Sequence, residues 1–356
     1  MRLVSRTLAH MTSTAEPADG AAPRKTPVTI ARIAERAGVS VPTVSKVING
    51  RADVAAETRR RVEAVIQEFR YQRPEKAAPA RLLELVFHEL ESAWAVEIIK
   101  GVEEVAREAG LAVVLSELQG RHSPRRDWVE ALLSRRPTGV ISVFSGLRPA
   151  QRAQLHSRGI AFVVVDPSGE PGHDTPSIGA TNWSGGLSAT RHLIELGHAR
   201  IAVISGPEQV LCSRARLDGY RAAMDAAGLS VDASLIRHGD FHVEAGFEQA
   251  RLLLQRPDRP TAIFAGSDLQ ALGVYDAARL AGLRIPEDLS VVGFDDLPVA
   301  RWIGPPLTTV RQPLVEMAAA AGRLVLALAK GEKPEQTRIE LATSLIIRQS
   351  TGPAGR

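Results

Sequence analysis

The feature that most constrains this chain is a regular alternation of short apolar runs and amphipathic stretches from Leu82 onward. Each apolar run ends in Gly, Asp, Ser or Pro, and the stretches between the runs have helical spacing. Buried strands that alternate with helices form parallel sheets with helices on both faces. The expected strands are 82–87, 111–115, 139–144, 161–165, 201–204, 262–265 and 290–294. The expected helices are 95–109, 183–196, 214–227, 244–254 and 269–281.

Two breaks divide this α/β region into two lobes. The alternation is interrupted at 178–183, and a proline-rich return follows at 305–309. We therefore expect the chain to go out to a second lobe and to come back with its last helix, 313–329. The first lobe is expected at about 82–180 and 310–345, and the second at about 181–305, within one domain of residues 82–350.

Residues 28–72 contain only helical patterns and predict a small three-helix bundle. Thr29 and Ser40 can cap helices at 30–37 and 41–49, Gly38 supplies the turn between them, and a third helix spans about 55–70. The predicted core of this bundle is Ile30, Ile33, Ala34, Val39, Val44, Val47, Ile48, Val62 and Phe69. Residues 1–27 lack periodicity and predict a disordered tail, in which Met11 could start translation as well as Met1.

The net charge of +4 is unevenly distributed. Residues 24–81 carry thirteen Lys and Arg against six Asp and Glu, a charge of +7, and residues 1–23 are neutral, so the remainder carries −3. A basic head on an acidic body is typical of a nucleic-acid-binding module joined to another domain. A solvated basic helix surface would give the same charge.

Several classes of protein find no support in the sequence. No run approaches the roughly 18 apolar residues of a membrane span, and residues 1–27 lack the apolar core of a secretory signal. The single cysteine, Cys212, excludes an intramolecular disulfide framework and a cysteine-rich metal site. The nine histidines show no metal spacing, and neither a phosphate loop nor a nucleophile elbow is present. We expect a cytoplasmic protein that is not an enzyme and has no catalytic residues, metal or cofactor.

The second helix of the bundle has an outer face suited to the major groove of DNA. Val44, Val47 and Ile48 point inward, which leaves a small or polar face outward. Hydroxyls and helix N-termini nearby can bind phosphates. The predicted DNA-binding residues are Thr29, Ser40, Val41, Pro42, Thr43, Ser45, Lys46, Asn49, Thr58 and Arg59.

A small-molecule site is expected where the carboxyl ends of the strands from both lobes face one cleft. Asp166, Ser267, Asp268 and Asp295 each follow an expected strand, although Asp268 could instead cap the next helix. Carboxylates bind vicinal hydroxyls, and aromatic faces cover the apolar side of a sugar ring. The aromatic candidates are Trp94, Trp183 and Phe241, and core packing is the alternative role for both tryptophans.

An ordered set of motifs along the chain resembles the lactose-repressor (LacI/GalR) family over about nine-tenths of its length. The motifs are Ile33-Ala34-Glu35-Arg36-Ala37-Gly38-Val39-Ser40, Arg216-Leu217-Asp218-Gly219-Tyr220, Gly293-Phe294-Asp295-Asp296 and Leu307-Thr308-Thr309-Val310. The resemblance implies a helix-turn-helix headpiece and a two-lobed α/β, periplasmic-binding-protein-like domain with parallel sheets. It also implies that this domain binds an effector and forms homodimers or tetramers. The absence of a heptad-bearing tail favours the dimer.

The resemblance assigns roles to single positions. Val41, Pro42 and Lys46 stand at the family's operator-reading sites, and Arg216 stands where the family contacts the effector. Lys46 replaces the more usual Arg, and a lysine cannot form the two parallel hydrogen bonds that Arg makes to guanine. We therefore expect lower specificity for guanine at this position.

The connection at 73–81 departs from the family. The family usually reads Pro-Asn after the tyrosine equivalent to Tyr71 and then forms a hinge helix whose leucine enters the minor groove. Here Pro79 suits a helix interior poorly, and Leu82 could be the wedge or could begin the first strand. A plain linker and a minor-groove hinge therefore both remain open.

These features together predict a transcription repressor. Its partners are expected to be double-stranded operator DNA, a second copy of the chain and a small-molecule effector, a mono- or oligosaccharide, with no membrane partner. A sugar-binding receptor without a DNA role is the alternative, and the basic headpiece argues against it. An enzyme of sugar metabolism is a third reading, for which the sequence offers no catalytic groups.

Overall fold

The computed structural model describes residues 29–48, 54–69, 80–90, 93–120, 123–169, 172 and 175–355. The chain divides into two compact units, Met1–Ala78 and Pro79–Arg356. The predicted tail 1–27, the DNA-binding candidate Asn49 and the linker positions 73–79 lie outside the described residues.

The smaller unit contains a three-helix bundle formed by α1 (Ile30–Ala37), α2 (Val41–Ile48) and α3 (Ala56–Glu68). Thr29 caps α1 through its side chain, and Gly38 ends the helix in the left-handed conformation with φ of 63°. All nine predicted core residues belong to the hydrophobic cluster of this bundle. Arg36 of α1 pairs with Glu68 of α3 at 3.1 Å on the surface.

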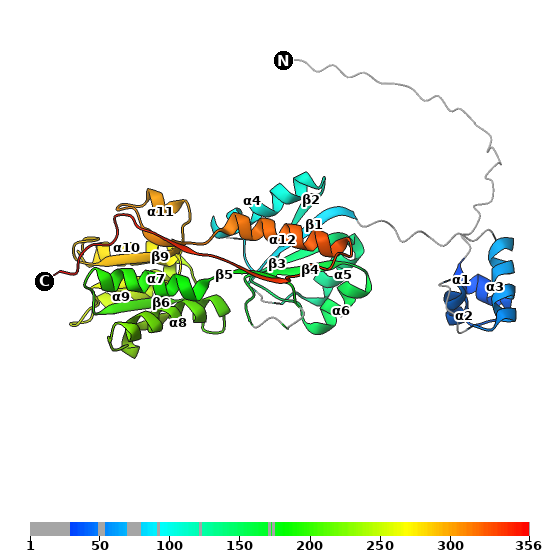
Figure 1. Ribbon diagram of the computed structural model, residues 1–356, viewed down its shortest axis with the longest axis horizontal. Coiled ribbons are helices and arrows are strands. Elements are labelled where there is room, and N and C mark those ends of the chain that lie inside the picture. Colours follow the sequence, from blue (N-terminus) through cyan, green and yellow to red (C-terminus); the bar gives the residue numbers. More distant parts are fainter. Residues whose placement is uncertain are drawn as a thin grey trace, which may run out of the picture. The chain divides into compact units, whose positions relative to one another are not determined.

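The larger unit contains two six-stranded sheets, one in each lobe (Figure 1). The first sheet has the order β11-β5-β4-β3-β1-β2 and is parallel throughout. Its strands are β1 (Ala80–Phe87), β2 (Ala112–Glu117), β3 (Pro137–Val143), β4 (Ala161–Val165), β5 (Ser177–Ala180) and β11 (Arg338–Leu341).

The second sheet has the order β12-β10-β9-β8-β6-β7 and is parallel except for β12 at its edge. Its strands are β6 (Ile201–Ser205), β7 (Ile236–His238), β8 (Ala262–Ala265), β9 (Ser290–Asp295), β10 (Thr308–Arg311) and β12 (Ser344–Ile346). The central strands β6, β8 and β9 are buried along their whole length, as expected of parallel strands covered on both faces.

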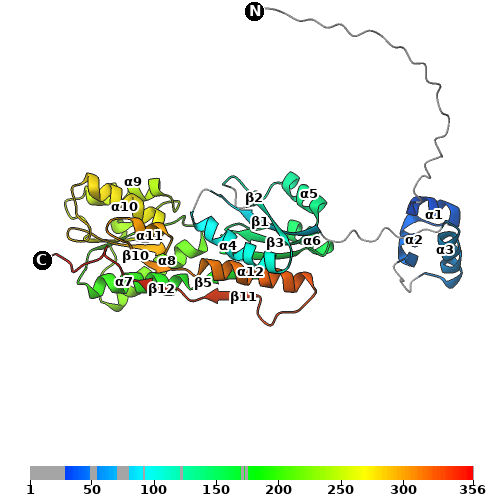
Figure 2. The same ribbon diagram turned by 90° about the horizontal axis from the view of Figure 1, so that it is seen from above.

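Helices cover both sheets (Figure 2). Those of the first lobe are α4 (Ala93–Glu108), α5 (Arg126–Arg135), α6 (Pro149–Ser157) and α12 (Leu314–Ala329). Those of the second lobe are α7 (Asn182–Glu195), α8 (Leu211–Ala226), the 3-10 turn η1 (Ala233–Leu235), α9 (Val243–Leu254), α10 (Asp268–Leu280) and α11 (Val299–Trp302). Late in the chain, α12 packs beside α4 and against β3, β4 and β5, so the chain does return to its first lobe. The predicted architecture, a helical headpiece before a two-lobed α/β domain with parallel sheets, is confirmed.

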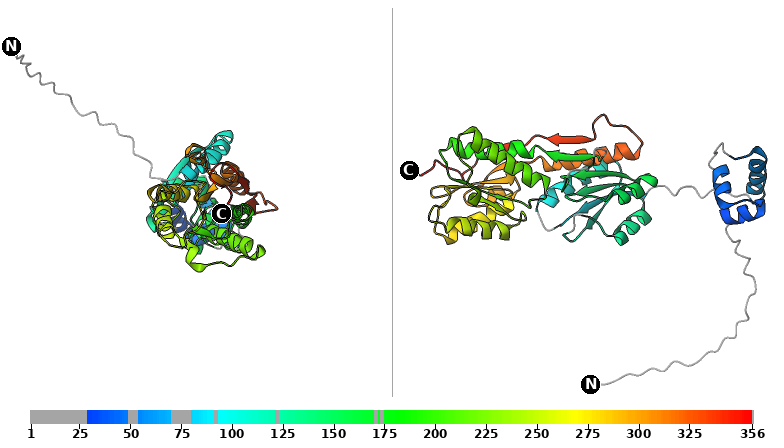
Figure 3. Two further views of the ribbon diagram at one scale, coloured as in Figure 1. Left: turned by 90° about the vertical axis from the view of Figure 1, so that its left-hand side faces the viewer. Right: turned by 90° about the horizontal axis from the view of Figure 1, so that it is seen from below.

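The lobe boundaries predicted from the sequence need correction. The second lobe does not end at 305, because β10 pairs with β9 and β12 pairs with β10. The chain therefore crosses between the lobes after β5, after β10 and after β11 (Figure 3). The hydroxyls of Thr181 and Thr343 join the first and third crossings at 3.1 Å. The strand β1 begins at Ala80, which shortens the predicted linker.

Within the part of the chain that the structure describes, no helix is both long and apolar enough to cross a membrane.

Helices α7 and α8 approach until their backbones touch. A Cβ atom on Gly219 would lie 2.2 Å from the carbonyl oxygen of Trp183, and one on Gly186 would lie 2.2 Å from that of Arg216. This close approach requires glycine at the crossing and places the middle of α8 against the start of α7.

We predict that Gly219→Ala destabilises the larger unit by about 1–3 kcal/mol, although alanine favours a helix, because the added methyl group forces α7 and α8 apart. Denaturant unfolding followed by tryptophan fluorescence measures this unit alone, since all four tryptophans lie within it. Gly146→Ala is the control, because a Cβ atom there meets nothing within 4 Å. Equal stability of the two variants would contradict the packing argument.

Candidate functional site

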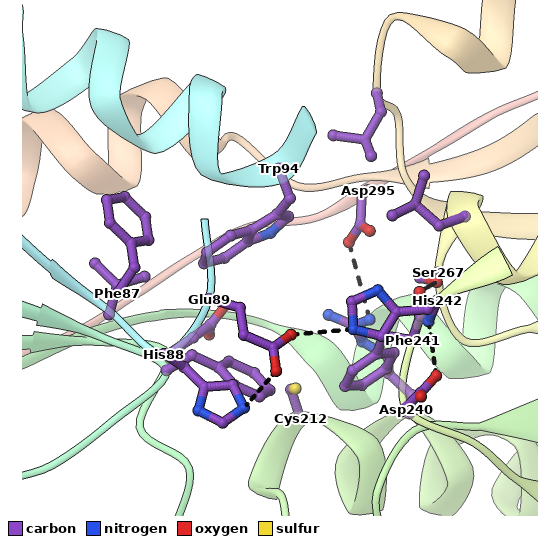
Figure 4. A pocket seen from close by; sticks show the side chains of 16 residues that line it. Phe87, His88, Glu89, Trp94, Cys212, Asp240, Phe241, His242, Ser267 and Asp295 are labelled. Atoms are coloured by element: carbon purple, nitrogen blue, oxygen red, sulfur yellow. Dashed lines mark hydrogen bonds and ion pairs between the residues drawn. The ribbon is translucent and has the colours of Figure 1, made fainter. Parts of the chain in front are cut away.

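A cavity of about 120 Å³ lies between the two lobes, at the carboxyl ends of their strands (Figure 4). The first lobe contributes residues that follow β1, β3 and β4, and the second contributes α8 and the segments after β7, β8 and β9. The lining residues are Phe87, His88, Glu89, Trp94, Val143, Phe144, Asp166, Cys212, Arg216, Asp240, Phe241, His242, Ser267, Leu269, Asp295 and Leu297. The position is the one that topology predicts for a ligand site in open α/β sheets.

The buried side chain of Arg216 is the main cation of this cavity. Its Nε donates to Oδ1 of Asn182 at 2.9 Å, and its Nη1 donates to the carbonyl of Gly266 at 2.5 Å. The guanidinium carbon lies 3.7 Å from the ring centroid of Phe294. The second terminal nitrogen, Nη2, donates to no described residue, which leaves one arm of the fork for a ligand.

Asp166 supplies a buried carboxylate that has no hydrogen-bond partner among the described residues. It follows β4, is 5% exposed and lines the cavity. Burial raises the pKa of Asp166 to about 6, although Arg216 acts in the opposite direction. A buried carboxylate without a donor is costly, so this group is suited to accept hydrogen bonds from a ligand.

Asp295 ends β9 and lies beside Arg216 within the second lobe. Its Oδ1 lies 3.9 Å from Nη1 of Arg216 and accepts from Nε2 of Gln312 at 2.6 Å. Burial raises the pKa of Asp295 to about 7, against the lowering effects of Arg216 and Gln312. The cavity thus holds one guanidinium and two carboxyl groups that burial makes easy to protonate.

Aromatic rings form the apolar part of the wall. The ring centroid of Phe144 lies 6.5 Å from that of Trp94 and 6.1 Å from that of Phe241, both in edge-on geometry. Phe144 belongs to the first lobe and Phe241 to the second, so this contact crosses the cleft. Together these rings can cover the flat side of a ligand ring.

Several residues that line the cavity have strained backbone conformations. Four non-glycine residues of its lining have positive φ: Phe144 (54°), Asp166 (44°), Phe241 (74°) and Asp295 (118°). Such conformations cost free energy and persist where the surrounding structure imposes them, most often at binding sites.

The structure brings together six of the eight effector-site residues predicted from the sequence: Trp94, Asp166, Arg216, Phe241, Ser267 and Asp295. Ser267 has two roles, since its hydroxyl caps α10 and donates to the carbonyl of Phe241.

The other two predicted residues, Asp268 and Trp183, are outside the cavity and need correction. Asp268 is fully buried, where its carboxylate accepts from the amide of Leu297 and the hydroxyl of Thr309. It is therefore a structural group that ties α10 to neighbouring segments. Trp183 is 47% exposed on α7, because the other face of that helix packs on α8.

Other lining residues were missed, chiefly His88, Glu89, Phe144, Cys212 and His242. His88, Glu89 and Phe144 directly follow β1 and β3. Position at the carboxyl end of a strand, which predicted Asp166, would therefore have identified them as well. His242 adjoins the predicted Phe241. Cys212 carried no signal in the sequence, and burial raises the pKa of its thiol to about 12.

In the headpiece, α2 exposes the face predicted to bind DNA. Val41, Pro42 and Lys46 are exposed, whereas Val44 and Val47 are buried. Ser40 and Thr43, at the start of α2, share a hydroxyl hydrogen bond of 2.9 Å. Of the other candidates, Thr29 is exposed, and Ser45, Thr58 and Arg59 are half-buried.

Two family models match the chain. Residues 29–74 match bacterial regulatory proteins of the lacI family, and residues 190–351 match a periplasmic binding protein-like domain. The HTH-type transcriptional repressor PurR of Escherichia coli is 34% identical over 328 residues, which cover 90% of this chain and 96% of PurR.

Solved structures of transcription regulators are also similar to this chain. The transcriptional regulator CelR in its cellobiose complex is 34% identical, with a TM-score of 0.70 over 91% of this chain and 99% of CelR. The Lac repressor dimer bound to operator and the anti-inducer ONPF is 29% identical, with a TM-score of 0.66 over 92% of this chain and all of the repressor chain.

We predict that Asp166→Asn stabilises the larger unit at pH 7.5 and not at pH 4. The pKa of Asp166 is about 6 in the folded protein and 3.8 ordinarily, so its favourable contribution is present below pH 3.8 and is lost as the pH rises through 6. Asparagine does not titrate, so its advantage should reach about 3 kcal/mol above pH 6.

Urea unfolding at several pH values, followed by tryptophan fluorescence, measures this difference. The exposed Asp225→Asn is the control and should show no such change. A wild-type protein more stable than Asp166→Asn at pH 7.5 would show that the carboxylate is held by contacts rather than left without them.

Proposed function

This chain belongs to the LacI family of bacterial regulatory proteins, DNA-binding transcription repressors with a ligand-binding domain, and on that premise we propose that a sugar in the cavity between its lobes controls its affinity for operator DNA. The observation that carries the proposal is a cavity walled by aromatic rings in which neither the carboxylate of Asp166 nor Nη2 of Arg216 has a hydrogen-bond partner among the described residues. Hydroxyl groups both donate and accept, so a sugar satisfies both groups at once.

The structure of CelR with cellobiose supports the choice of a sugar, because that relative covers nearly the whole chain at 34% identity. The edge-on rings of Trp94, Phe144 and Phe241 suit the apolar face of a pyranose. They also suit a planar heterocycle, and a nucleobase is therefore the second candidate effector.

For the operator, we propose a homodimer whose two α2 helices enter successive major grooves about one helical turn apart. The Lac repressor, which matches 92% of this chain, is a dimer on its operator. Ligand binding would favour one arrangement of the lobes, and the headpieces would then gain or lose their fit to the two half-sites. Such a protein acts in the cytoplasm, on chromosomal DNA.

The alternative functions have less support. A sugar receptor without a DNA role would need neither the exposed face of α2 that is predicted to bind DNA nor the basic headpiece. An enzyme would need a group poised for chemistry, and the charged groups of the cavity are explained by binding alone.

We predict that the full-length protein binds a palindromic operator at least about 1,000-fold more tightly than random DNA at fixed salt. Lys46→Ala should weaken operator binding about tenfold or more, because Lys46 is exposed at a reading position, whereas the exposed Lys330→Ala should leave it unchanged. Fluorescence anisotropy measures both affinities. Equal affinity for operator and random DNA would end the proposal.

A thermal-shift screen with cellobiose, glucose, ribose and adenine would separate the two effector classes. A rise in melting temperature with a sugar, and its loss in Arg216→Lys, supports the proposed effector. A rise with adenine alone assigns the cavity to nucleobases.

A further inference from the structure

A hydrogen bond crosses the cleft at the cavity. Oε2 of Glu89, which follows β1 in the first lobe, lies 3.1 Å from Nε2 of His242, the residue before α9 in the second lobe. Figure 4 shows Glu89 between His242 and His88, whose Nε2 is 3.6 Å from Oε1 of Glu89. This bridge therefore links the two lobes directly, in addition to the three crossings of the chain.

Both ends of the bridge are held in place by their own lobes. Flanking Glu89, the carbonyl of His88 accepts from the amide of Gly120, and the amide of Leu90 donates to Glu117. On the other side, the backbone amide of His242 donates to Oδ1 of Asp240 at 3.0 Å. These hydrogen bonds hold each partner to its own lobe, so separation of the lobes would break the bridge.

The bridge lies at the boundary between the cavity and water. Both partners line the cavity, yet their side chains remain 34% and 35% exposed. Within the same lining, Arg216 and Asp166 are nearly inaccessible, at 4% and 5%. The edge-on contact of Phe144, which follows β3, with Phe241, the residue before His242, also crosses the cleft.

We propose that Glu89 and His242 form a latch that closes the cleft over its ligand and limits which ligands it retains. A ligand that fits behind the latch is held by the closed lobes, and a larger one keeps the latch open. A cavity of about 120 Å³ is comparable to the roughly 150 Å³ cavity that encloses one benzene ring, so the closed state suits a single ring. The latch rests on the proposed effector role of the cavity for its biological use.

Cys212 provides a natural reporter of opening that needs neither effector nor DNA. It is the only cysteine of the chain, it lines the cavity, and it is 6% exposed. Because Cys212 is buried while the lobes are together, we expect iodoacetamide to reach it when they part, so that the alkylation rate of the full-length protein reports how often the lobes part.

The test compares the alkylation rates of the wild type, Glu89→Leu, His242→Leu and the double variant. A partly exposed hydrogen-bonded pair of this kind should slow opening about two- to fivefold, so each single variant should react faster by that factor. The double variant should react no faster than the faster single variant, because all three lose the same interaction.

A second histidine–glutamate pair supplies matched controls. Nε2 of His238 lies 3.4 Å from Oε1 of Glu208, His238 is also 34% exposed, and both residues belong to the second lobe. His238→Leu and Glu208→Leu should therefore alkylate at the wild-type rate. Circular dichroism confirms that every variant is folded.

Three results would overturn the latch: wild-type rates in the single variants, equal acceleration in the control variants, or single effects that multiply in the double variant. Failure of operator binding would leave these rates untouched, so the latch and the proposed function can fail separately.

Discussion

The site depends on one interaction, the burial of the Arg216 guanidinium against Phe294 with its hydrogen bonds to Asn182 and Gly266. Asn182 begins α7 directly after the first crossing between the lobes, and Gly266 follows β8. A single side chain thus joins the crossing, the second sheet and the cavity. The close approach of α7 and α8 through glycines is what brings α8 near enough for this contact.

The groups that line the cavity lower the stability of the fold, and this loss of folding free energy points to a binding role. Two carboxyl groups are buried beside one guanidinium, their pKa values are raised, and four lining residues have strained backbones. None of these features stabilises the fold. Buried unpaired charges and strained backbones are found most often at sites that bind a ligand. The same groups explain why a ligand that hydrogen-bonds Asp166 and Arg216 would favour a closed arrangement of the lobes.

Much of this organisation could be predicted from the sequence, because long buried strands and capped helices leave strong local patterns. The strands 161–165 and 262–265 and the helix Ile30–Ala37 lie as predicted. The short edge strands β7, β11 and β12 were not predicted, since three or four partly exposed residues carry no clear periodicity. The predicted lobe boundary at 305 was wrong because β10 and β12, which follow it, belong to the second sheet. Position after a strand predicted that Asp166 and Asp295 would lie at the cavity, where the structure places them, but it could not show that the carboxylate of Asp268 turns inward to Leu297 and Thr309. Contacts across the cleft, such as Glu89 with His242, depend on how two lobes meet, and local sequence does not encode that.

The central claim is that occupancy of the cavity and binding of DNA are coupled. The most direct measurement is a pair of titrations at fixed salt: operator affinity with and without a saturating sugar that raises the melting temperature, and the affinity for that sugar with and without operator. The account predicts a change of about fivefold or more in the first and the same factor in the second, since coupling between two sites is reciprocal. An operator affinity that stays constant while the cavity is filled would contradict it.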